Sequence, residues 1–220
     1  MKINSEWRII GRLISLAIFC AVTVAAGGGI TFIQKPVGAI YLLLWLLWAG
    51  TTMLWRKEGV VSSYDKNQLI GLTVLGIIAI PALLVGPPWE YANFTGPLPR
   101  DGILSWVGLA IFAASIVLQS AAMLGLRGAY TFRLGIQKGQ RLVKGGPYRF
   151  VRNPGYFGFI LSVIGIGLSL SSIIALLSIV PVVIFILWRI RHEEEMLMRE
   201  FGREYKAYMK ETKRLIPFVY

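Results

Sequence analysis

One stretch of the chain determines how it folds: it begins with GGPYRFVRNPGYFG at residues 145–158 and ends with WRIRHEEE at residues 188–195. Between these charged segments lie two apolar runs, Tyr156–Leu170 and Ile173–Trp188, joined only by a pair of serines. A membrane-spanning helix takes about 20 residues, so two runs this short fit a helical hairpin that sits tilted or slightly sunk in the bilayer. Because a hairpin brings its own ends together, we expect the two charged segments to form a pocket.

The remainder of the chain is apolar as well. Hydrophobic residues make up 55% of its 220 residues and charged residues only 15%, and the mean hydropathy is +0.63. This composition is typical of an integral membrane protein rather than a soluble domain. Six candidate spans follow the apolar runs: Ile9–Ala26, Val37–Trp55, Leu69–Val85, Gly102–Leu126 and the two runs of the hairpin. We therefore expect an all-α fold, a polytopic membrane bundle of about six transmembrane helices.

The sequence predicts a single membrane domain, residues 1–220, whose two halves differ in polar content. Residues 1–126 have almost no ionisable side chains inside their apolar runs, whereas residues 127–220 carry nearly all the polar chemistry. We predict that residues 1–126 form a transmembrane scaffold and that residues 127–220 hold the functional site.

The net charge of +12 reflects the orientation of the chain in a membrane. Of the 23 Lys and Arg residues, 21 fall in alternate segments, namely residues 2–12, 56–66, 127–152 and 189–214. The segments between them hold only Lys35 and Arg100. Cytoplasmic segments of membrane proteins carry an excess of basic residues, so both termini and the pocket are expected to face the cytoplasm. The basic residues therefore indicate a membrane bilayer as the partner, and no nucleic acid is expected.

Cysteine and histidine are too scarce for several kinds of site. Cys20 is the only cysteine and His192 the only histidine. An intrachain disulfide, a thiolate metal cluster and a multi-histidine metal site are thereby excluded, and no metal is expected.

The two ends of the hairpin carry complementary chemistry. Pro154 opens the fifth span, and the free backbone amides at such a helix start can bind an anion or a carbonyl group. Arg149 and Arg152 would strengthen this site, or they would only contact lipid phosphates as markers of the cytoplasmic side. At the other end, Arg189 and Glu193 share one helical face. With three glutamates in succession there, some of the acid is expected to face inward toward a cation or hydrogen-bond donors.

Beyond the hairpin, the sequence predicts an amphipathic C-terminal helix. Its apolar positions recur at helical spacing after Glu195, with charges between them, and the pattern ends before Pro217. They are Leu197, Phe201, Tyr205 and Tyr208. The helix is expected either to lie on the membrane surface or to cover the pocket.

Taken together, these residues resemble a known family. The resemblance rests on GGPYRFVRNPGYFG, the hairpin, the pair Glu193-Glu194, and a tail with Leu197, Phe201-Gly202, Glu204-Tyr205, Tyr208 and Ile216-Pro217. In this combination and spacing, residues 137–217 are similar to the isoprenylcysteine carboxyl methyltransferase family and its relatives among phospholipid N-methyltransferases. In that family the C-terminal half binds S-adenosylmethionine on the cytoplasmic side of a helical membrane bundle.

The resemblance implies specific roles for individual residues. The implied contacts of S-adenosylmethionine are Gln140, Arg141, Leu142, Val143, Tyr148, Asn153, Pro154, Gly155, Tyr156, Glu193 and Glu194. Arg189 and Glu193 are implied to be catalytic, and Arg189 matches an arginine implicated in substrate handling and methyl transfer. The family usually has histidine where this chain has Asn153. Asparagine keeps a neutral hydrogen bond but carries no proton, which puts any role that needs imidazole in question.

The expected reaction is methyl transfer from S-adenosylmethionine to an amphiphilic acceptor that is soluble in the membrane. A carboxylate acceptor is already ionised at neutral pH, and Arg189 can orient it through two hydrogen bonds. An amine acceptor, as in phospholipid N-methyltransferases, would need a base, for which Glu193, Glu194 and His192 are the candidates. The sequence mildly favours the carboxylate, whether on a lipidated peptide, a lipid or a small hydrophobic acid.

Two other interpretations stay open. NADPH-dependent membrane sterol-type reductases look related in this half, but they tend to have an Arg-His-x-Asn-Tyr core and a tail with aspartate and cysteine. This chain has RNPGY and EEEM instead. A non-enzymatic membrane protein is the other alternative, although a transporter would be expected to place ionisable groups near the bilayer midplane, where these spans have almost none.

Overall fold

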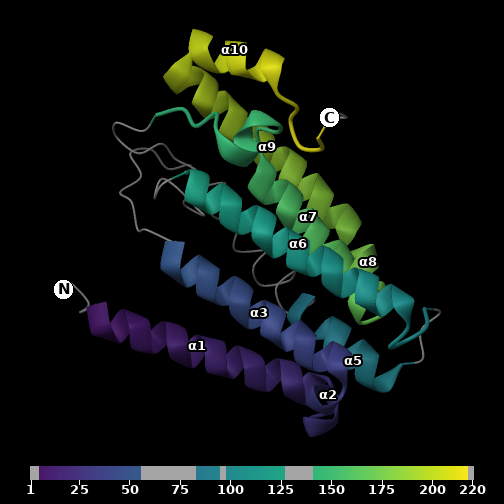
Figure 1. The fold of residues 1–220 in the computed structure, drawn as a ribbon. Helices are drawn as coiled ribbons and strands as arrows, with labels where there is room; N and C mark the ends of the chain where they lie inside the picture. Colours follow the sequence, from purple (N-terminus) through teal and green to yellow (C-terminus); the bar gives the residue numbers. More distant parts are fainter. Residues whose placement is uncertain (1–4, 56–82, 95–97, 127–140, 218–220) are drawn as a thin grey trace.

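The described part of the chain is all-helical, as expected (Figure 1). The structure is a computed structural model and describes residues 5–55, 83–94, 98–126 and 141–217. Among these residues no β-strand forms beyond a single parallel bridge between Val151 and Lys213. The elements are α1 (Ser5–Ala26), α2 (Ile30–Gln34), α3 (Pro36–Trp55), α5 (Gly86–Asn93), α6 (Ile103–Gly125), the 3-10 helix η1 (Gly146–Arg149), α7 (Pro154–Ser169), α8 (Ile173–Leu177), α9 (Ile179–Phe201) and α10 (Arg203–Glu211).

Five of the six expected spans coincide with helices of the structure. They are α1, α3, α6, α7 and the α8–α9 segment, whereas most of Leu69–Val85 lies outside the described residues. By length and composition, two described segments could cross a membrane, namely α6 and residues Ile173–Phe201. The apolar parts of α1, α3 and α7 are shorter.

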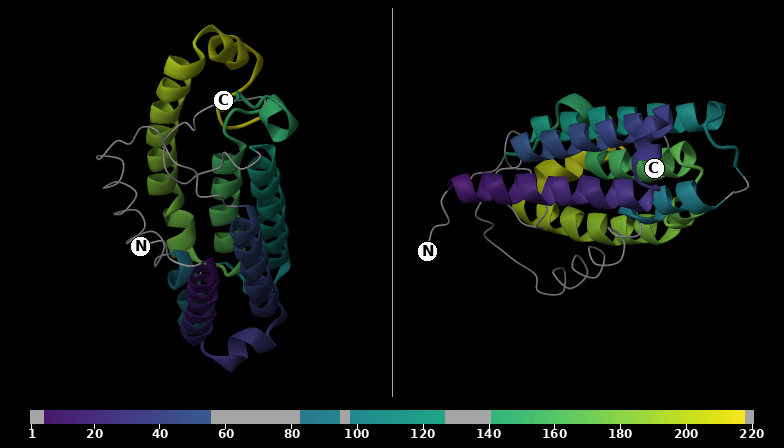
Figure 2. Two further views of the ribbon diagram at one scale, coloured as in Figure 1. Left: turned by 90° about the vertical axis from the view of Figure 1, so that its left-hand side faces the viewer. Right: turned by 90° about the horizontal axis from the view of Figure 1, so that it is seen from below.

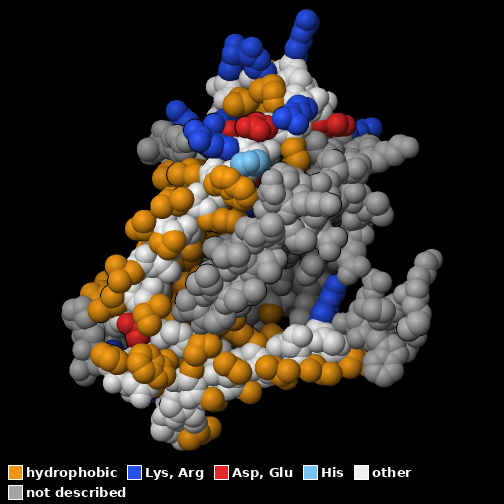
Figure 3. Space-filling view, turned by 180° about the vertical axis from the view of Figure 1, so that it is seen from behind, with side chains coloured by type: hydrophobic (Ala, Val, Ile, Leu, Met, Phe, Trp, Pro, Cys, Tyr) orange, Lys and Arg blue, Asp and Glu red, His pale blue; other side chains and the backbone are white. Residues whose placement is uncertain are grey.

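The long helices run side by side and leave different elements at the two ends of the molecule (Figures 1 and 2). Helix α7 packs against both α6 and α9, α6 also packs against α3, and α3 against α1. Helix α10 and the C-terminus lie at one end, whereas α2 and α5 lie at the opposite end (Figure 1). The charged side chains gather at the α10 end, and hydrophobic side chains cover much of the flank below it (Figure 3).

The predicted hairpin is present and turns at its two serines. Ser171 adopts a left-handed conformation with φ of 52°, and the Ser172 hydroxyl accepts a hydrogen bond of 3.1 Å from the Ala175 amide, which caps α8. The Glu90 carboxylate accepts hydrogen bonds from the Ser172 hydroxyl and, at 3.0 Å, from the Ile174 amide. The turn is therefore fixed by side-chain capping and tied to α5.

Helices α6 and α7 share the most extensive interface in the described structure, and small residues allow it. A Cβ atom added at Gly165 would lie 2.6 Å from the Phe112 backbone nitrogen, and one at Gly108 would lie 2.2 Å from that of Ser169. Such distances leave room only for hydrogen, so the backbones approach as closely as small residues permit. Neighbouring side chains then interlock around Phe112 and Ile166, both almost fully buried.

The C-terminal helix differs from the single amphipathic helix expected after Glu195. Helix α9 continues from the apolar layer to Phe201, and the chain then turns at Gly202, whose φ is 48°. A left-handed φ favours glycine, which lacks the Cβ that would clash there. Helix α10 begins after this turn and folds back, burying Tyr205 and Tyr208. The apolar spacing is thus that of two helices joined by a glycine turn.

Candidate functional site

Three side chains of the hairpin meet beyond its apolar layer. Arg189 and Glu193 lie one turn apart on α9, and Tyr156 lies in the first turn of α7. The Tyr156 hydroxyl donates a hydrogen bond of 2.7 Å to Oε1 of Glu193 and accepts one from Nε of Arg189. The Arg189 Nε is also 3.6 Å from Oε1 of Glu193. Arg189 is only 5% exposed, so a buried cation here contacts both a phenol and a carboxylate.

Local sequence accounts for this arrangement. Proline is favoured in the first turn of a helix, where its missing N–H costs nothing, and Pro154 opens α7 in that position. Tyr156 consequently lies at the end of α7 that faces the last part of α9. The spacing of four residues between Arg189 and Glu193 places both on one face of α9, as expected. The face that they share is the one that meets α7.

A second cluster surrounds Glu194, whose two oxygens each form an ion pair with a different arginine. Nε of Arg152 lies 2.9 Å from Oε1, and an amino group of Arg214 lies 2.8 Å from Oε2. The side chains of Arg152 and Glu194 are only 7% and 8% exposed. The acid therefore faces inward toward cations, as expected. Arg152 is buried in this cluster rather than directed at lipid phosphates, because its guanidinium donates to Glu194 and to two backbone carbonyls.

Residues 212–215, here called the C-terminal strap, are fastened to the loop that precedes α7. The Arg152 amide donates to the Lys213 carbonyl at 2.8 Å, and the Asn153 side-chain amide donates to the Arg214 carbonyl at 2.8 Å. Arg152 also donates to the Thr212 carbonyl. Helix α10 thus returns the chain to the start of the hairpin, where the strap covers it.

Tyrosines fix the loop from two sides. The Tyr148 hydroxyl of η1 donates to the Ala122 carbonyl of α6 at 3.3 Å, and the Tyr208 hydroxyl of α10 donates to the Tyr148 carbonyl at 2.6 Å. Burial raises the pKa of Tyr208 to about 12 and also raises the pKa of Tyr205 above its ordinary value. Both phenols therefore remain neutral at physiological pH, and Tyr208 keeps its proton for the hydrogen bond to the Tyr148 carbonyl.

A groove of about 460 Å³ opens beside the Glu194 cluster, between α9, α10 and the strap. Its lining includes the charged Arg191, Glu194 and Arg214 and the apolar Met198 and Met209. Charged and apolar side chains thus line one hollow at the α10 end of the molecule, where the charged band of Figure 3 lies.

Known proteins share this C-terminal architecture. The sequence profile of the family described as phospholipid methyltransferase matches residues 103–204, from α6 to the start of α10. A rice relative (Oryza sativa subsp. indica), named probable protein-S-isoprenylcysteine O-methyltransferase, is 29% identical over 123 residues, which cover 53% of this chain and 62% of the relative. The yeast protein-S-isoprenylcysteine O-methyltransferase (Saccharomyces cerevisiae) is 39% identical over 83 residues, or 36% of this chain and 33% of the yeast protein. The C-terminal half of the chain is thus similar to phospholipid methyltransferases and to protein-S-isoprenylcysteine O-methyltransferases.

The whole fold also resembles that of a solved methyltransferase. A eukaryotic intramembrane isoprenylcysteine carboxyl methyltransferase has a TM-score of 0.62 to this chain, with 94% of this chain and 75% of that structure covered. At 19% identity this likeness concerns the fold alone. The chain spans about three fifths of the length of the rice relative. The resemblance expected from residues 137–217 is confirmed, and the matched profile begins further upstream, at residue 103.

The structure brings together many of the residues that the resemblance to the methyltransferase family implies. Arg189, Tyr156 and Glu193 form the first cluster, and Glu194 forms the second. Tyr148, Asn153, Pro154 and Gly155 lie in the adjoining loop and helix start. Arg141, Leu142 and Val143 lie in the segment that leads into η1, with Arg141 exposed and the other two half-buried, while Gln140 lies outside the described residues.

Sequence reasoning missed Arg214 and the strap. Arg214 and Lys213 counted only as cytoplasmic charge, because nothing in their local sequence indicates which carboxylate they meet. The available signal was Gly202 in the middle of a helical pattern, since such a glycine often marks a helix end. With a turn there, the tail returns toward the hairpin, and Glu194 becomes the acid within its reach.

Proposed function

We propose that this protein is a membrane methyltransferase that transfers a methyl group from S-adenosylmethionine to a carboxylate on an amphiphilic, membrane-soluble acceptor. An isoprenylcysteine carboxylate is the acceptor class that the names of its relatives support. The observation that carries the proposal is the buried Arg189, held by Tyr156 and Glu193 at the end of the apolar hairpin. A fixed cation at that depth suits an anionic headgroup whose tail lies in the bilayer.

The residues of the first cluster have separate tasks in this reaction. Arg189 orients the acceptor carboxylate, because a guanidinium presents donors in a planar fork that matches two carboxylate oxygens. Tyr156 and Glu193 both contact Nε of that guanidinium, and these contacts fix its orientation. The acceptor is ionised at neutral pH, so no residue has to remove a proton. Catalysis then rests on alignment and on the exclusion of water.

The residues near the hairpin start fit S-adenosylmethionine by their chemistry. Glu193, 26% exposed along its side chain, offers a carboxylate to a cationic sulfonium, and the Tyr156 ring adds an electron-rich face. We assign further contacts to Gln140–Val143, Tyr148 and Asn153–Gly155, as the family resemblance implies. When bound, the cofactor supplies a methyl group on a positively charged sulfur. Glu194 acts as a positioning residue instead, since both its oxygens are already paired with arginines.

The site is proposed to face the cytoplasm in a chain of six spans with both termini on that side. Support comes from the distribution of charge, because the charged band lies at the α10 end (Figure 3). Lys35, in contrast, lies between α2 and α3, and Arg100 lies just before α6, at the opposite end. The positive-inside rule then orients the α10 end toward the cytoplasm, where a soluble cofactor can enter.

Parallel binding titrations test the cofactor. Detergent-solubilised protein is titrated with S-adenosylhomocysteine and, separately, with NADPH, and we expect saturable binding of the first alone. Binding of NADPH without S-adenosylhomocysteine would support a reductase and overturn the proposal.

A transfer assay with a labelled methyl group tests the acceptor. The substrates are a farnesylated cysteine derivative, the same compound as its carboxamide, and phosphatidylethanolamine. We expect label only on the free carboxylate, released by mild base as methanol. Base-stable label on phosphatidylethanolamine would assign the protein to amine methylation instead. Arg189→Ala is expected to abolish transfer while leaving S-adenosylhomocysteine affinity within about threefold, which separates acceptor handling from cofactor binding.

A further inference from the structure

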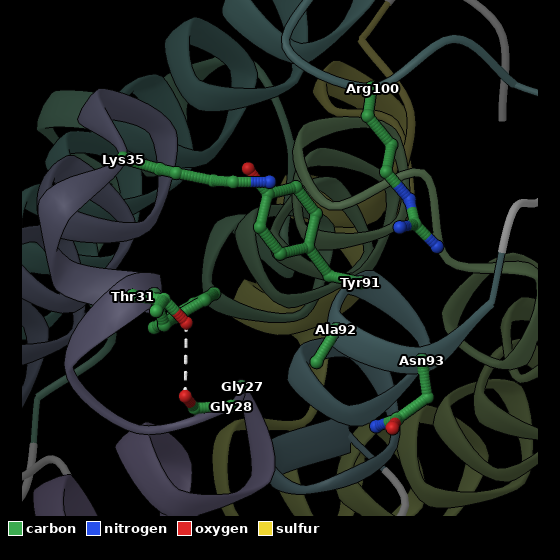
Figure 4. A pocket seen from close by; sticks show the side chains of 9 residues that line it. Gly27, Gly28, Thr31, Lys35, Tyr91, Ala92, Asn93 and Arg100 are labelled. Carbon is green, nitrogen blue, oxygen red and sulfur yellow. Dashed lines mark hydrogen bonds between the residues drawn. The ribbon is translucent and has the colours of Figure 1, made fainter.

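A second hollow lies at the opposite end of the molecule from the methyl-transfer site. This cavity of about 200 Å³ lies between the turn after α1, α2 with the adjoining Lys35, α5 and the segment before α6 (Figure 4). Its lining includes Gly28, Thr31, Lys35, Tyr91, Asn93 and Arg100. Nothing in the proposed methyl transfer uses these residues, and they lie outside the segment that the family profile matches.

The cavity gathers two cations around one aromatic ring. Lys35 and Arg100 are the two basic residues of the segments expected on the far side of the membrane, and both line this cavity. Lys35 Nζ lies 4.8 Å from the centre of the Tyr91 ring and the Arg100 guanidinium 5.6 Å from it. Figure 4 shows both side chains reaching toward Tyr91 from different segments. Holding two like charges this close costs free energy unless an anion offsets them.

The nearby acids offset only part of this charge. Asp101 lies 3.6 Å from Lys35 Nζ, and both side chains are nearly half exposed, so the attraction is weak. Glu90 directs its carboxylate at the hairpin turn instead. One amino group of Arg100 donates to the Glu90 carbonyl at 2.8 Å, while the buried Nε of Arg100 has no hydrogen-bond partner among the residues that the structure describes. A buried donor without a partner is costly, and an anion in the cavity would satisfy it.

The surroundings of the cavity match the headgroup layer of a membrane. Large apolar side chains are exposed near it, with Ile30 65%, Phe94 58% and Trp89 44% exposed. The rings of Trp89 and Phe94 are in contact, with centroids 5.5 Å apart. Exposed aromatic rings at the end of a helical bundle are typical of the boundary between hydrocarbon and headgroups. Phosphate is the anion that membranes present at this depth.

We propose that this cavity binds a phosphate group, with Lys35 and Arg100 as its cationic ligands. Lys35 supplies a compact charge with rotatable donors, and Arg100 supplies the fork that fits phosphate oxygens. The volume holds a phosphate group, with its remaining substituents outside. The bound group would link α2–α3, α5 and the segment before α6, so we expect it to stabilise the scaffold end of the molecule. This role is independent of the methyl-transfer site.

The test measures binding of two phosphate sources to the full chain. Purified protein in neutral detergent is titrated with inorganic phosphate in one arm and with short-chain phosphatidylglycerol in the other, and thermal unfolding and native mass spectrometry report binding. The double variant Lys35→Gln/Arg100→Gln is compared with Arg203→Gln/Lys206→Gln, which removes two exposed cations from α10. We expect affinity for the preferred source to fall about tenfold for each lining cation removed and to stay unchanged in the control.

The two arms distinguish the source of the phosphate, and the double variant tests the site itself. Saturable binding of phosphatidylglycerol alone identifies a lipid headgroup, and saturable binding of inorganic phosphate identifies the free anion; either supports the site if the double variant loses it. Equal affinity in the wild type and the double variant, or no saturable binding in either arm, overturns the proposal. Should the double variant fail to fold, Lys35→Arg and Arg100→Lys keep the charge, and each is expected to bind better than the matching single glutamine variant. If the charge-conserving variants lose as much phosphate affinity as the single glutamine variants, the proposal is also overturned.

Discussion

At the scale of single residues, the chemistry of the candidate site depends on how Arg189 is held. A buried guanidinium without partners would be strongly unfavourable, and here Tyr156 and Glu193 supply those partners. The phenol accepts from the arginine and donates to the glutamate, so its position is defined from both sides. The same contacts that make burial of the cation tolerable therefore also fix the orientation of the guanidinium.

Replacing Tyr156 by phenylalanine tests this positioning role. The change removes the hydroxyl that links Arg189 to Glu193 but keeps the ring, so the guanidinium gains freedom and the acceptor loses its alignment. Small misplacements of reacting groups cost about 100-fold in rate, and we expect turnover to fall about 10- to 100-fold. Affinity for S-adenosylhomocysteine should change by less than about threefold. Steady-state kinetics and a binding titration on the same preparation check both numbers.

The matched control is Tyr41→Phe, which deletes a buried tyrosine hydroxyl from α3, away from the site. Its turnover is expected to equal that of the wild type. If both variants lose activity to the same degree, general loss of stability explains the effect and the positioning role of Tyr156 is wrong.

At the scale of elements, the return of the chain through Gly202 and α10 completes the site. The strap contributes backbone carbonyls to Arg152 and Asn153, and Arg214 contributes a second cation to Glu194. Glu194 thus joins three segments that are distant in sequence, namely the loop before α7, the end of α9 and the strap. A carboxylate with both oxygens satisfied by arginines makes that junction specific.

Glu194→Gln should release the strap. The substitution leaves Arg152 and Arg214 facing a neutral amide, and breaking one partner of a buried ion pair costs about 3 kcal/mol of stability. We expect a lower unfolding temperature and faster cleavage by trypsin after Lys213 and Arg214. The adjacent Glu195→Gln removes an exposed carboxylate and is expected to change stability by less than about 0.5 kcal/mol. Equal behaviour of the two variants would show that the Glu194 contacts do not hold the strap.

Alkaline pH should loosen the same region through Tyr208. Its pKa is raised to about 12, which means that the folded state favours the neutral phenol. The resulting stabilisation is complete below the ordinary tyrosine pKa of about 10 and is lost as the pH rises toward about 12. Ionisation would remove the hydrogen bond to the Tyr148 carbonyl. Tyr208→Phe is therefore expected to be less stable than the wild type at neutral pH, with the difference shrinking between about pH 10 and about pH 12.

Thermal unfolding of both proteins across that range measures the effect. Titration of the lysines affects both proteins alike, so the difference between the two melting temperatures isolates Tyr208. A difference that stays constant with pH would mean that the phenol does not titrate in this range.

Sequence patterns predicted the parts of this structure that depend on residues close together in the sequence. The hairpin follows from two apolar runs around a pair of serines, and the contact of Arg189 with Glu193 follows from a spacing of four residues. Tyr156 was assigned to the same site only because of the family resemblance, since a contact between α7 and α9 depends on how the two helices face each other. The pairing of Glu194 with Arg214 depends in turn on the helix break at Gly202, which apolar periodicity alone does not reveal.

At the scale of the whole molecule, the two halves are joined through the core between α6 and α7. A buried polar chain connects three helices there: Trp48 of α3 donates to Gln119 of α6, which donates at 2.8 Å to Ser162 of α7. Close glycine contacts run along the same interface. Because α7 also carries Tyr156, the position of the first cluster relative to the scaffold depends on this packing.

Gly165→Ala should therefore disturb both stability and activity. The added Cβ would lie 2.6 Å from the Phe112 nitrogen and 2.9 Å from the Gly108 carbonyl oxygen, both backbone atoms that yield only if the helices separate. Overpacking of this kind costs about 1–3 kcal/mol, and we expect a lower unfolding temperature. A shift of α7 also moves Tyr156 away from α9, so turnover should fall more than cofactor affinity. Gly50→Ala is the control, since nothing lies within 4 Å of a Cβ added there and alanine favours the helix. If Gly165→Ala is as stable and active as Gly50→Ala, close packing of α6 on α7 does not set the position of the site.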